Sequence, residues 1–154
     1  MQYIRFSLLA AFVSVTALAQ AEVCVEGAVE YGLFASDYQD FQAGERILAR
    51  SNQPIEPREV IPAKLGSKFG VRYNLVGKTA DDSPLTLLYL TPGVVTPQGT
   101  RHDKFVVQQK LVPGAPQEVM AFEFTEPHEV VPGEWHFMVF QDDRKLLEQR
   151  FTVR

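Results

Sequence analysis

The sequence has little cysteine, which limits how its fold can be held together. Cys24 is the only cysteine among 154 residues, so no disulfide can form within one chain. Basic residues are also too few for a nucleic-acid-binding surface, because 15 Lys and Arg stand against 19 Asp and Glu, a net charge of −4. The hydrophobic content of 45% is ordinary for a globular protein. We therefore expect one domain that is stabilised by its core alone.

Long hydrophobic runs are missing except near the N-terminus. There, Arg5 precedes about a dozen mostly apolar residues and the triplet Ala19-Gln20-Ala21. The run is short for a membrane span, which needs about 20 residues. Small residues at positions −3 and −1 suit signal peptidase. We predict a signal peptide over residues 1–21, cleaved after Ala21 or alternatively after Ala19. A single domain over 22–154, periplasmic or secreted from a bacterium, would remain; a retained N-terminal anchor is the alternative.

Cys24 would lie close to the new N-terminus. A lipid anchor requires a small residue directly before the cysteine, and Val23 stands there. The sequence instead favours a buried, unreactive thiol on the first strand, with an intermolecular disulfide as the alternative.

Alternation of hydrophobic and polar residues predicts strands through most of the chain. Turns rich in Gly, Pro and Asp separate these segments, including a hairpin tip at 141–144, and no window shows a helical period. Residues 35–60 form a long excursion, with one short edge strand near 46–49. The pattern predicts an all-β, antiparallel two-sheet sandwich of immunoglobulin or fibronectin type, with a barrel as the alternative. The predicted strands are 23–34, 68–77, 84–91, 104–112, 118–127, 134–140 and 145–153.

Three segments carry a resemblance to a known family: EYGLF (30–34), IPAKLGSKFGVRYNLVG (61–77) and GEWHFMVFQDDRKLLEQRFTV (133–153). Together they resemble a family of short secreted bacterial proteins, a domain of unknown function with an immunoglobulin-like β-sandwich. The shared motifs, Gly-x-x-Phe-Gly and Gly-x-Trp-x-Phe, are structural. The resemblance implies no reaction and supplies no catalytic residues.

A metal site is the first chemical possibility. On a strand, His136 and Met138 would point the same way about 7 Å apart, and imidazole with thioether suits copper. The sequence places no other histidine or methionine close to the pair, and Cys24 alone cannot build a zinc site. We therefore expect no cofactor, and a copper-binding or chaperone-like periplasmic protein using His136 and Met138 is the alternative function.

Catalytic groups are few. Ser83 and the pair His102-Asp103 would have to meet in space to form a nucleophilic site, and no nucleophile elbow surrounds Ser83. The acidic pairs Asp81-Asp82 and Asp142-Asp143 fall in turns, where solvated side chains or weak calcium binding are expected. The sequence predicts a protein that is not an enzyme.

A surface is the strongest candidate. In an immunoglobulin-type sandwich the strands at 84–91 and 134–140 lie side by side, and both are apolar on both faces. If Trp135 and Leu87 face the core, hydrophobic residues must also face outward. Either the 35–60 excursion covers them or they form a homodimer or partner interface. The predicted role is an exported, non-catalytic module that binds a protein or envelope component. The predicted interaction surface comprises Leu88, Leu90, His136, Met138 and Phe140.

Overall fold

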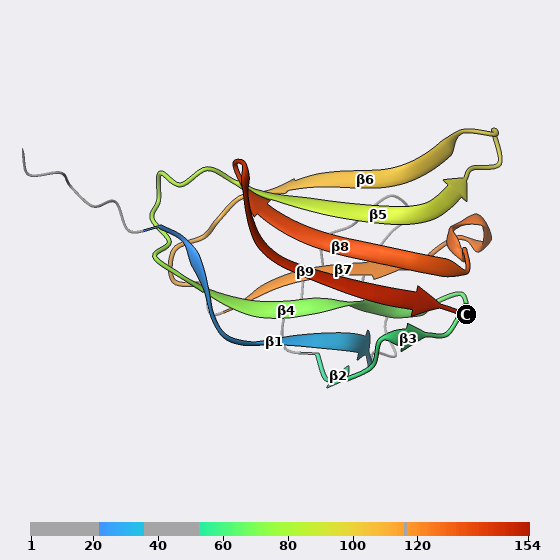
Figure 1. The fold of residues 1–154 in the computed structure, drawn as a ribbon, viewed down its shortest axis with the longest axis horizontal. Helices are drawn as coiled ribbons and strands as arrows, with labels where there is room; N and C mark the ends of the chain where they lie inside the picture. Colours follow the sequence, from blue (N-terminus) through green and yellow to red (C-terminus); the bar gives the residue numbers. More distant parts are fainter. Residues whose placement is uncertain (1–21, 36–52, 116) are drawn as a thin grey trace, which may run out of the picture.

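A computed structural model describes residues 22–35, 53–115 and 117–154 (Figure 1). The predicted signal peptide and the strand expected near 46–49 fall outside these residues. The described residues form nine strands and one 3₁₀ turn, Pro127–Glu129, which lies between the seventh and eighth of these strands. None of the described helical residues forms a segment long and apolar enough to cross a membrane. The strands are β1 (Cys24–Phe34), β2 (Ile55–Glu56), β3 (Val60–Ile61), β4 (Lys68–Val76), β5 (Leu85–Val95), β6 (Arg101–Gln109), β7 (Glu118–Glu123), β8 (Gly133–Gln141) and β9 (Arg144–Val153).

The strands form two sheets, which confirms the predicted sandwich and not the barrel. The four-stranded sheet has the order β2-β1-β4-β7, and the five-stranded sheet has the order β3-β9-β8-β5-β6. Every pairing is antiparallel except that of β3 with the end of β9. Figure 1 shows β7 passing behind β8 and β9, with β6 at the outer edge of its sheet.

Several strand boundaries differ from the prediction. The excursion contains the two-residue strands β2 and β3, which are too short to give a pattern in sequence. β5 runs on to Val95 instead of ending at 91, because a bulge between Leu90 and Val94 accommodates Pro92. β6 consequently starts at Arg101, and β7 ends at Glu123.

The core is built from the inward-facing residues that alternation predicts. On β5 and β8 these residues are fully buried, at 0% exposure. Phe69 on β4 contacts the rings of Trp135 and Phe137, with centroids 5.8 and 5.3 Å apart. Trp135 also donates a hydrogen bond from Nε1 to the carbonyl of Val131 at 3.0 Å. Trp135 is therefore the core anchor that its position predicts.

The last glycine of the Gly-x-x-Phe-Gly motif, Gly70, allows close packing of two backbones. A Cβ at this position would lie 2.0 Å from the carbonyl oxygen of Met120 on the paired strand β7. The glycine thus lets β4 and β7 approach, while the preceding Phe69 fills the core.

The prediction for Cys24 was wrong. Its thiol is exposed, and Sγ lies 3.5 Å from the carbonyl of Glu22. The reason is strand phase: Val23 is buried at 1% and Val25 packs against the core, so the residue between them faces outward.

Candidate interaction surface

The two strands that carry the predicted surface are neighbours, as the sequence analysis expected. β5 and β8 pair with Leu88 opposite Met138 and Leu90 opposite His136. Alternate residues of both strands point into the core, which leaves the intervening ones on the outside of the five-stranded sheet. The inward set, at 0% exposure, is Leu85, Leu87, Tyr89, Trp135, Phe137 and Val139.

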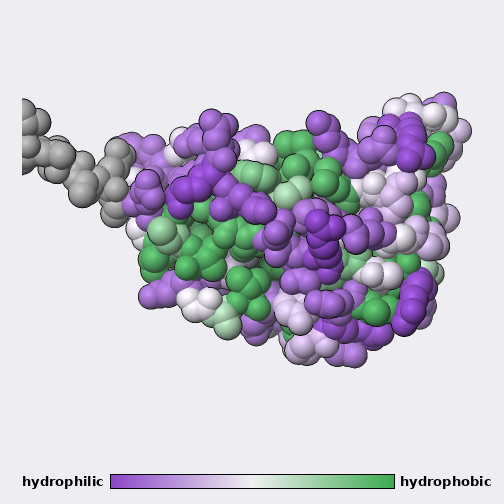
Figure 2. All heavy atoms as spheres, viewed as in Figure 1, coloured by the Kyte–Doolittle hydropathy of each residue, from purple (hydrophilic) through white to green (hydrophobic). Residues whose placement is uncertain are grey.

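Four outward residues of β5 and β8, Leu88, Leu90, Met138 and Phe140, are hydrophobic and half-buried. We call one group the outer strip: Val106, Leu88, Leu90, Met138 and Phe140. Val106 of β6 stands opposite Leu88 and is 52% exposed, so it extends the predicted surface by one strand. Figure 2 shows hydrophobic surface over β5 and its neighbours, with hydrophilic residues over β9. Hydrophobic surface also lies over the starts of β9 and β1, whose half-buried Leu147 and Val25 pack against the core.

Paired charges border the outer strip on the β9 side. Glu148, opposite Met138, accepts from Lys145 Nζ at 2.9 Å and lies 3.0 Å from His136 Nε2. The hydrogen bond from Lys145, supported by His136, holds the pKa of Glu148 below its usual value. Arg150 similarly contacts Glu134 at 2.6 Å. An apolar centre with a polar rim is the usual anatomy of a protein-binding patch.

His136 is placed beside Met138 on the outer face, as predicted. Its side chain is 11% exposed, and its Nε2 is directed at the Glu148 carboxylate. Within the described residues no group of three or more His, Cys, Asp or Glu side chains could hold a metal ion. Nothing in this arrangement supports the copper-binding alternative.

The part of the excursion that the structure describes does not lie across the outer strip. β2 pairs with the end of β1 in the other sheet, and β3 pairs with Thr152 and Val153 at the far edge of β9. Residues 36–52 fall outside the described part, so the covering that the sequence allowed is untested there.

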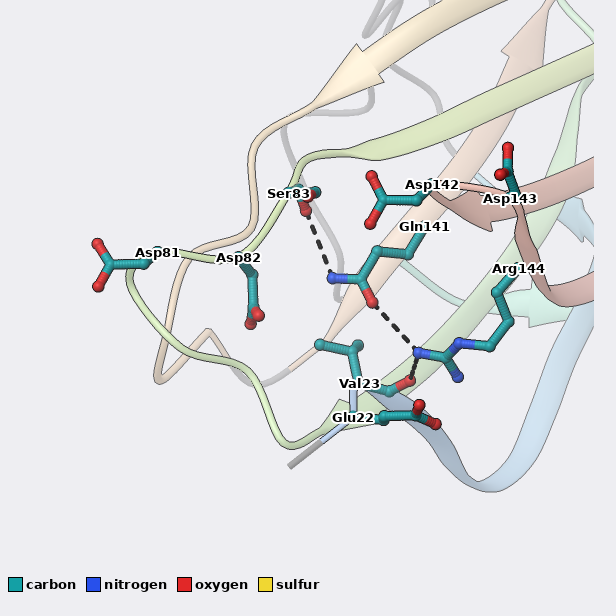
Figure 3. Close-up of a pocket in the computed structure, with 9 residues that line it drawn as sticks. All are labelled: Glu22, Val23, Asp81, Asp82, Ser83, Gln141, Asp142, Asp143 and Arg144. Carbon is teal, nitrogen blue, oxygen red and sulfur yellow. Dashed lines mark hydrogen bonds between the residues drawn. The ribbon is translucent and has the colours of Figure 1, made fainter. Parts of the chain in front are cut away.

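An open pocket of about 740 Å³ lies at the end of the sandwich where β8 turns into β9. It brings together both acidic pairs, Asp81-Asp82 and Asp142-Asp143, which the sequence left in separate turns. Arg144 crosses it, donating to the carbonyl of Val23 at 2.7 Å (Figure 3).

The acids in this pocket do not converge on one point. Asp82 accepts a hydrogen bond from the backbone N–H of Thr79, so it closes its own turn. Figure 3 shows Asp81 pointing away from the pocket and Asp143 pointing away from Asp142. Calcium needs several oxygens around one centre. The pocket is thus an acidic depression without an assembled cation site.

Ser83 and His102 lie at opposite ends of β5. Ser83 precedes Leu85, whereas His102 stands opposite Val94 at the other end. Nine residues of strand separate those positions by about 30 Å. Ser83 and His102-Asp103 therefore cannot form one catalytic group.

A buried ion pair was missed by the sequence analysis. Lys78 Nζ lies 3.2 Å from Glu118 Oε1, and both side chains are at most 7% exposed. Gln109 donates to the second Glu118 oxygen at 2.9 Å, and Lys78 also donates to the carbonyl of Ala115. Burial, together with the charge of Glu118, raises the pKa of Tyr73. These residues join the ends of β4, β6 and β7 and belong to the fold.

Comparisons with known proteins agree with this architecture. A solved immunoglobulin-like protein of Pseudomonas aeruginosa is 61% identical, with a TM-score of 0.77, and the match covers 88% of this chain and 99% of that one. An alkylpurine DNA glycosylase of Pseudomonas fluorescens, bound to DNA, is 19% identical over 82% of this chain and 30% of its own. Its TM-score of 0.34 is too low to relate the two folds.

The comparison with curated proteins finds no match. The comparison with protein families matches residues 22–153 to the Domain of unknown function (DUF3859). This match spans the strands of both sheets. The chain belongs to the DUF3859 family, whose member here has an immunoglobulin-like β-sandwich fold.

Proposed function

We propose that this protein is a non-catalytic binding module that recognises another envelope protein through the outer strip. The observation that carries the proposal is the apolar face of β5 and β8. Leu88 and Met138 stand opposite each other on the outside of the sheet, where charged or polar pairs are usual.

The paired charges that border the outer strip favour a protein as the binding partner. Lys145 and Glu148 satisfy each other beside the outer strip, so an approaching apolar surface need not leave either charge unpaired. The centre of the strip is depleted of charge, as the buried centres of protein interfaces are.

We also propose that the protein is exported to the periplasm or beyond and acts there after removal of residues 1–21. The family match supports this boundary, because it starts at residue 22. The mass and N-terminal sequence of the protein recovered from the periplasm test it. A first residue of Glu22 is expected, whereas an uncleaved chain in the cytoplasm would contradict it.

In-cell photo-crosslinking tests the binding role. A photoreactive residue at Met138 should give a discrete adduct with another protein, and the same residue at Asn74 should not. Asn74 is the matched control because it is also half-buried but belongs to β4 of the other sheet. Phe140→Asp should abolish the adduct without unfolding the domain. An identical adduct pattern from both positions, or none from Met138, would contradict the proposal.

A further inference from the structure

The residues that directly follow the predicted cleavage site are already fixed to the folded domain. Val23 belongs to the core cluster and is 1% exposed. β1 begins at the next residue, where Cys24 pairs with Val76 of β4. The domain therefore holds its chain up to Glu22, the residue that stands immediately after Ala21.

An arginine of the other sheet holds the backbone of Val23. Arg144, at the start of β9, donates from Nη2 to the carbonyl of Val23 at 2.7 Å and to Gln141 Oε1 at 3.2 Å. Gln141, at the end of β8, donates in turn to the carbonyl of Ser83 at 3.5 Å. Figure 3 shows these three bonds in a row. They tie the entrance of β1 to the hairpin between β8 and β9.

A glycine directly after β4 packs against the preceding residue, Glu22. A Cβ at Gly77 would lie 2.5 Å from the carbonyl oxygen of Glu22. Gly77 also has a φ of +78°, a conformation that favours glycine. The carbonyl of Glu22 is thus packed against Gly77, and the next carbonyl, that of Val23, is bonded to Arg144.

A peptidase that cuts after Ala21 has to hold residues on both sides of the bond. Susceptibility to proteolysis depends on the burial and hydrogen bonding of the backbone concerned, because an extended peptide is bound through its main chain and its side chains. Glu22 and Val23 are the first two residues beyond the bond. In the folded domain the Val23 carbonyl is already bonded and its side chain lies in the core.

We propose that folding of the domain makes the Ala21–Glu22 bond inaccessible to signal peptidase, so that the signal peptide has to be removed while the chain is unfolded. This inference rests on the cleavage after Ala21 proposed above. The step is hydrolysis: one water molecule is consumed, and the broken amide leaves a carboxylate on Ala21 and an ammonium group on Glu22. A folded precursor is cut only when the start of β1 opens, at a rate that follows the small open fraction.

Purified signal peptidase acting on full-length precursor that has been folded in detergent tests this order of events. The unaltered precursor is compared with one that carries Gly-Ser-Gly-Ser between Ala21 and Glu22. The insertion keeps every residue before the bond and moves the bond away from the domain. We expect the precursor with the insertion to be cut at least about tenfold faster, since its cleavage needs no exposure of Val23. Equal rates for the two precursors, whether fast or slow, would overturn the proposal.

Gly77→Ala tests whether the contact with Glu22 contributes to the protection. The added Cβ should displace the Glu22 carbonyl and raise the open fraction, so the folded precursor should be cut faster than the unaltered one. Gly66→Ala is the matched control: its φ of +86° imposes a similar strain, but its Cβ would meet nothing within 4 Å. Thermal unfolding shows that both variants are folded. Equal cleavage rates for the two variants would contradict a protective role of this contact.

The N-terminus of the exported protein separates this inference from the proposal on which it rests. A periplasmic protein that begins at a residue other than Glu22 would contradict the cleavage site itself. A protein that begins at Glu22, together with folded precursors that are cut at equal rates, would contradict only the order of cleavage and folding.

Discussion

The inner and outer faces of β5 and β8 are both hydrophobic, yet they are packed differently. Leu87, Tyr89, Trp135 and Phe137 face inward at 0% exposure, while Leu88, Leu90 and Met138 on the same strands remain half-buried. Composition alone would treat the two faces alike. The inner face is thus buried by folding, whereas the described outer residues of the same strands stay partly exposed to solvent.

Removing the largest side chain of the inner face, Trp135, should have the largest effect on stability. Trp135→Ala should lower the free energy of unfolding by about 3–5 kcal/mol, because it opens a cavity against Phe69, Phe122 and Phe124. It also leaves the carbonyl of Val131 without this donor. Urea denaturation measures the effect. A loss below about 1 kcal/mol would show that the aromatic cluster is not the stabilising centre.

Leu87 and Leu88 give the sharpest matched pair, since one side chain type occupies adjacent positions on opposite faces. Leu87→Ala should cost about 2–5 kcal/mol of unfolding free energy, the range for buried leucines. Leu88→Ala should cost about 1 kcal/mol or less, because its side chain is already partly in water. Urea denaturation under one set of conditions compares them. Equal losses would mean that the outer strip contributes to folding as the core does.

Glu30 provides the comparison with an outer face that is polar. It stands opposite Arg72 on the four-stranded sheet and accepts from Arg72 at 2.7 and 2.9 Å. The hydrogen bond from Arg72 lowers the pKa of Glu30 from its usual 4.5. A depressed carboxyl pKa stabilises the fold above the unfolded value, and this contribution is lost as pH falls through the folded value.

Glu30→Gln should therefore reduce stability slightly at neutral pH, by less than about 1 kcal/mol, since the Glu30 side chain is 51% exposed. The difference from the unaltered protein should shrink below pH 4.5, where the carboxyl group becomes protonated. Urea denaturation at neutral and acidic pH measures it. A difference that is constant with pH would mean that the ion pair is not its source.

Alternation along single strands predicted much of this structure. The inward phase of Phe69, Met120 and Trp135 follows from a period of two, and each is fully buried. The pairing of β5 with β8 followed from the fold type. The predicted outer residues could be placed for the same reason, because the inner face fixes where the remaining side chains point.

Other features depend on contacts that a local pattern does not contain. Lys78 and Glu118 are 40 residues apart, and their ion pair forms only when β4 and β7 meet. Asp82 and Asp142 reach one pocket because two distant turns lie at the same end of the sandwich. The exposure of Cys24, by contrast, could have been predicted from the sequence. Val23 and Val25 on either side of it face the core, so strand alternation places Cys24 on the outside.

Cysteine labelling in living cells tests most directly whether the outer strip is occupied by a partner. Leu88→Cys and Asn74→Cys, each in a Cys24→Ser background, would be exposed to a maleimide that reaches the periplasm but not the cytoplasm. Both positions are half-buried and lie on the outer faces of different sheets. We predict that Leu88→Cys reacts readily in the purified protein but is protected in cells, while Asn74→Cys reacts similarly in both. Equal reactivity of Leu88→Cys in cells and in purified protein would contradict the binding role of this face.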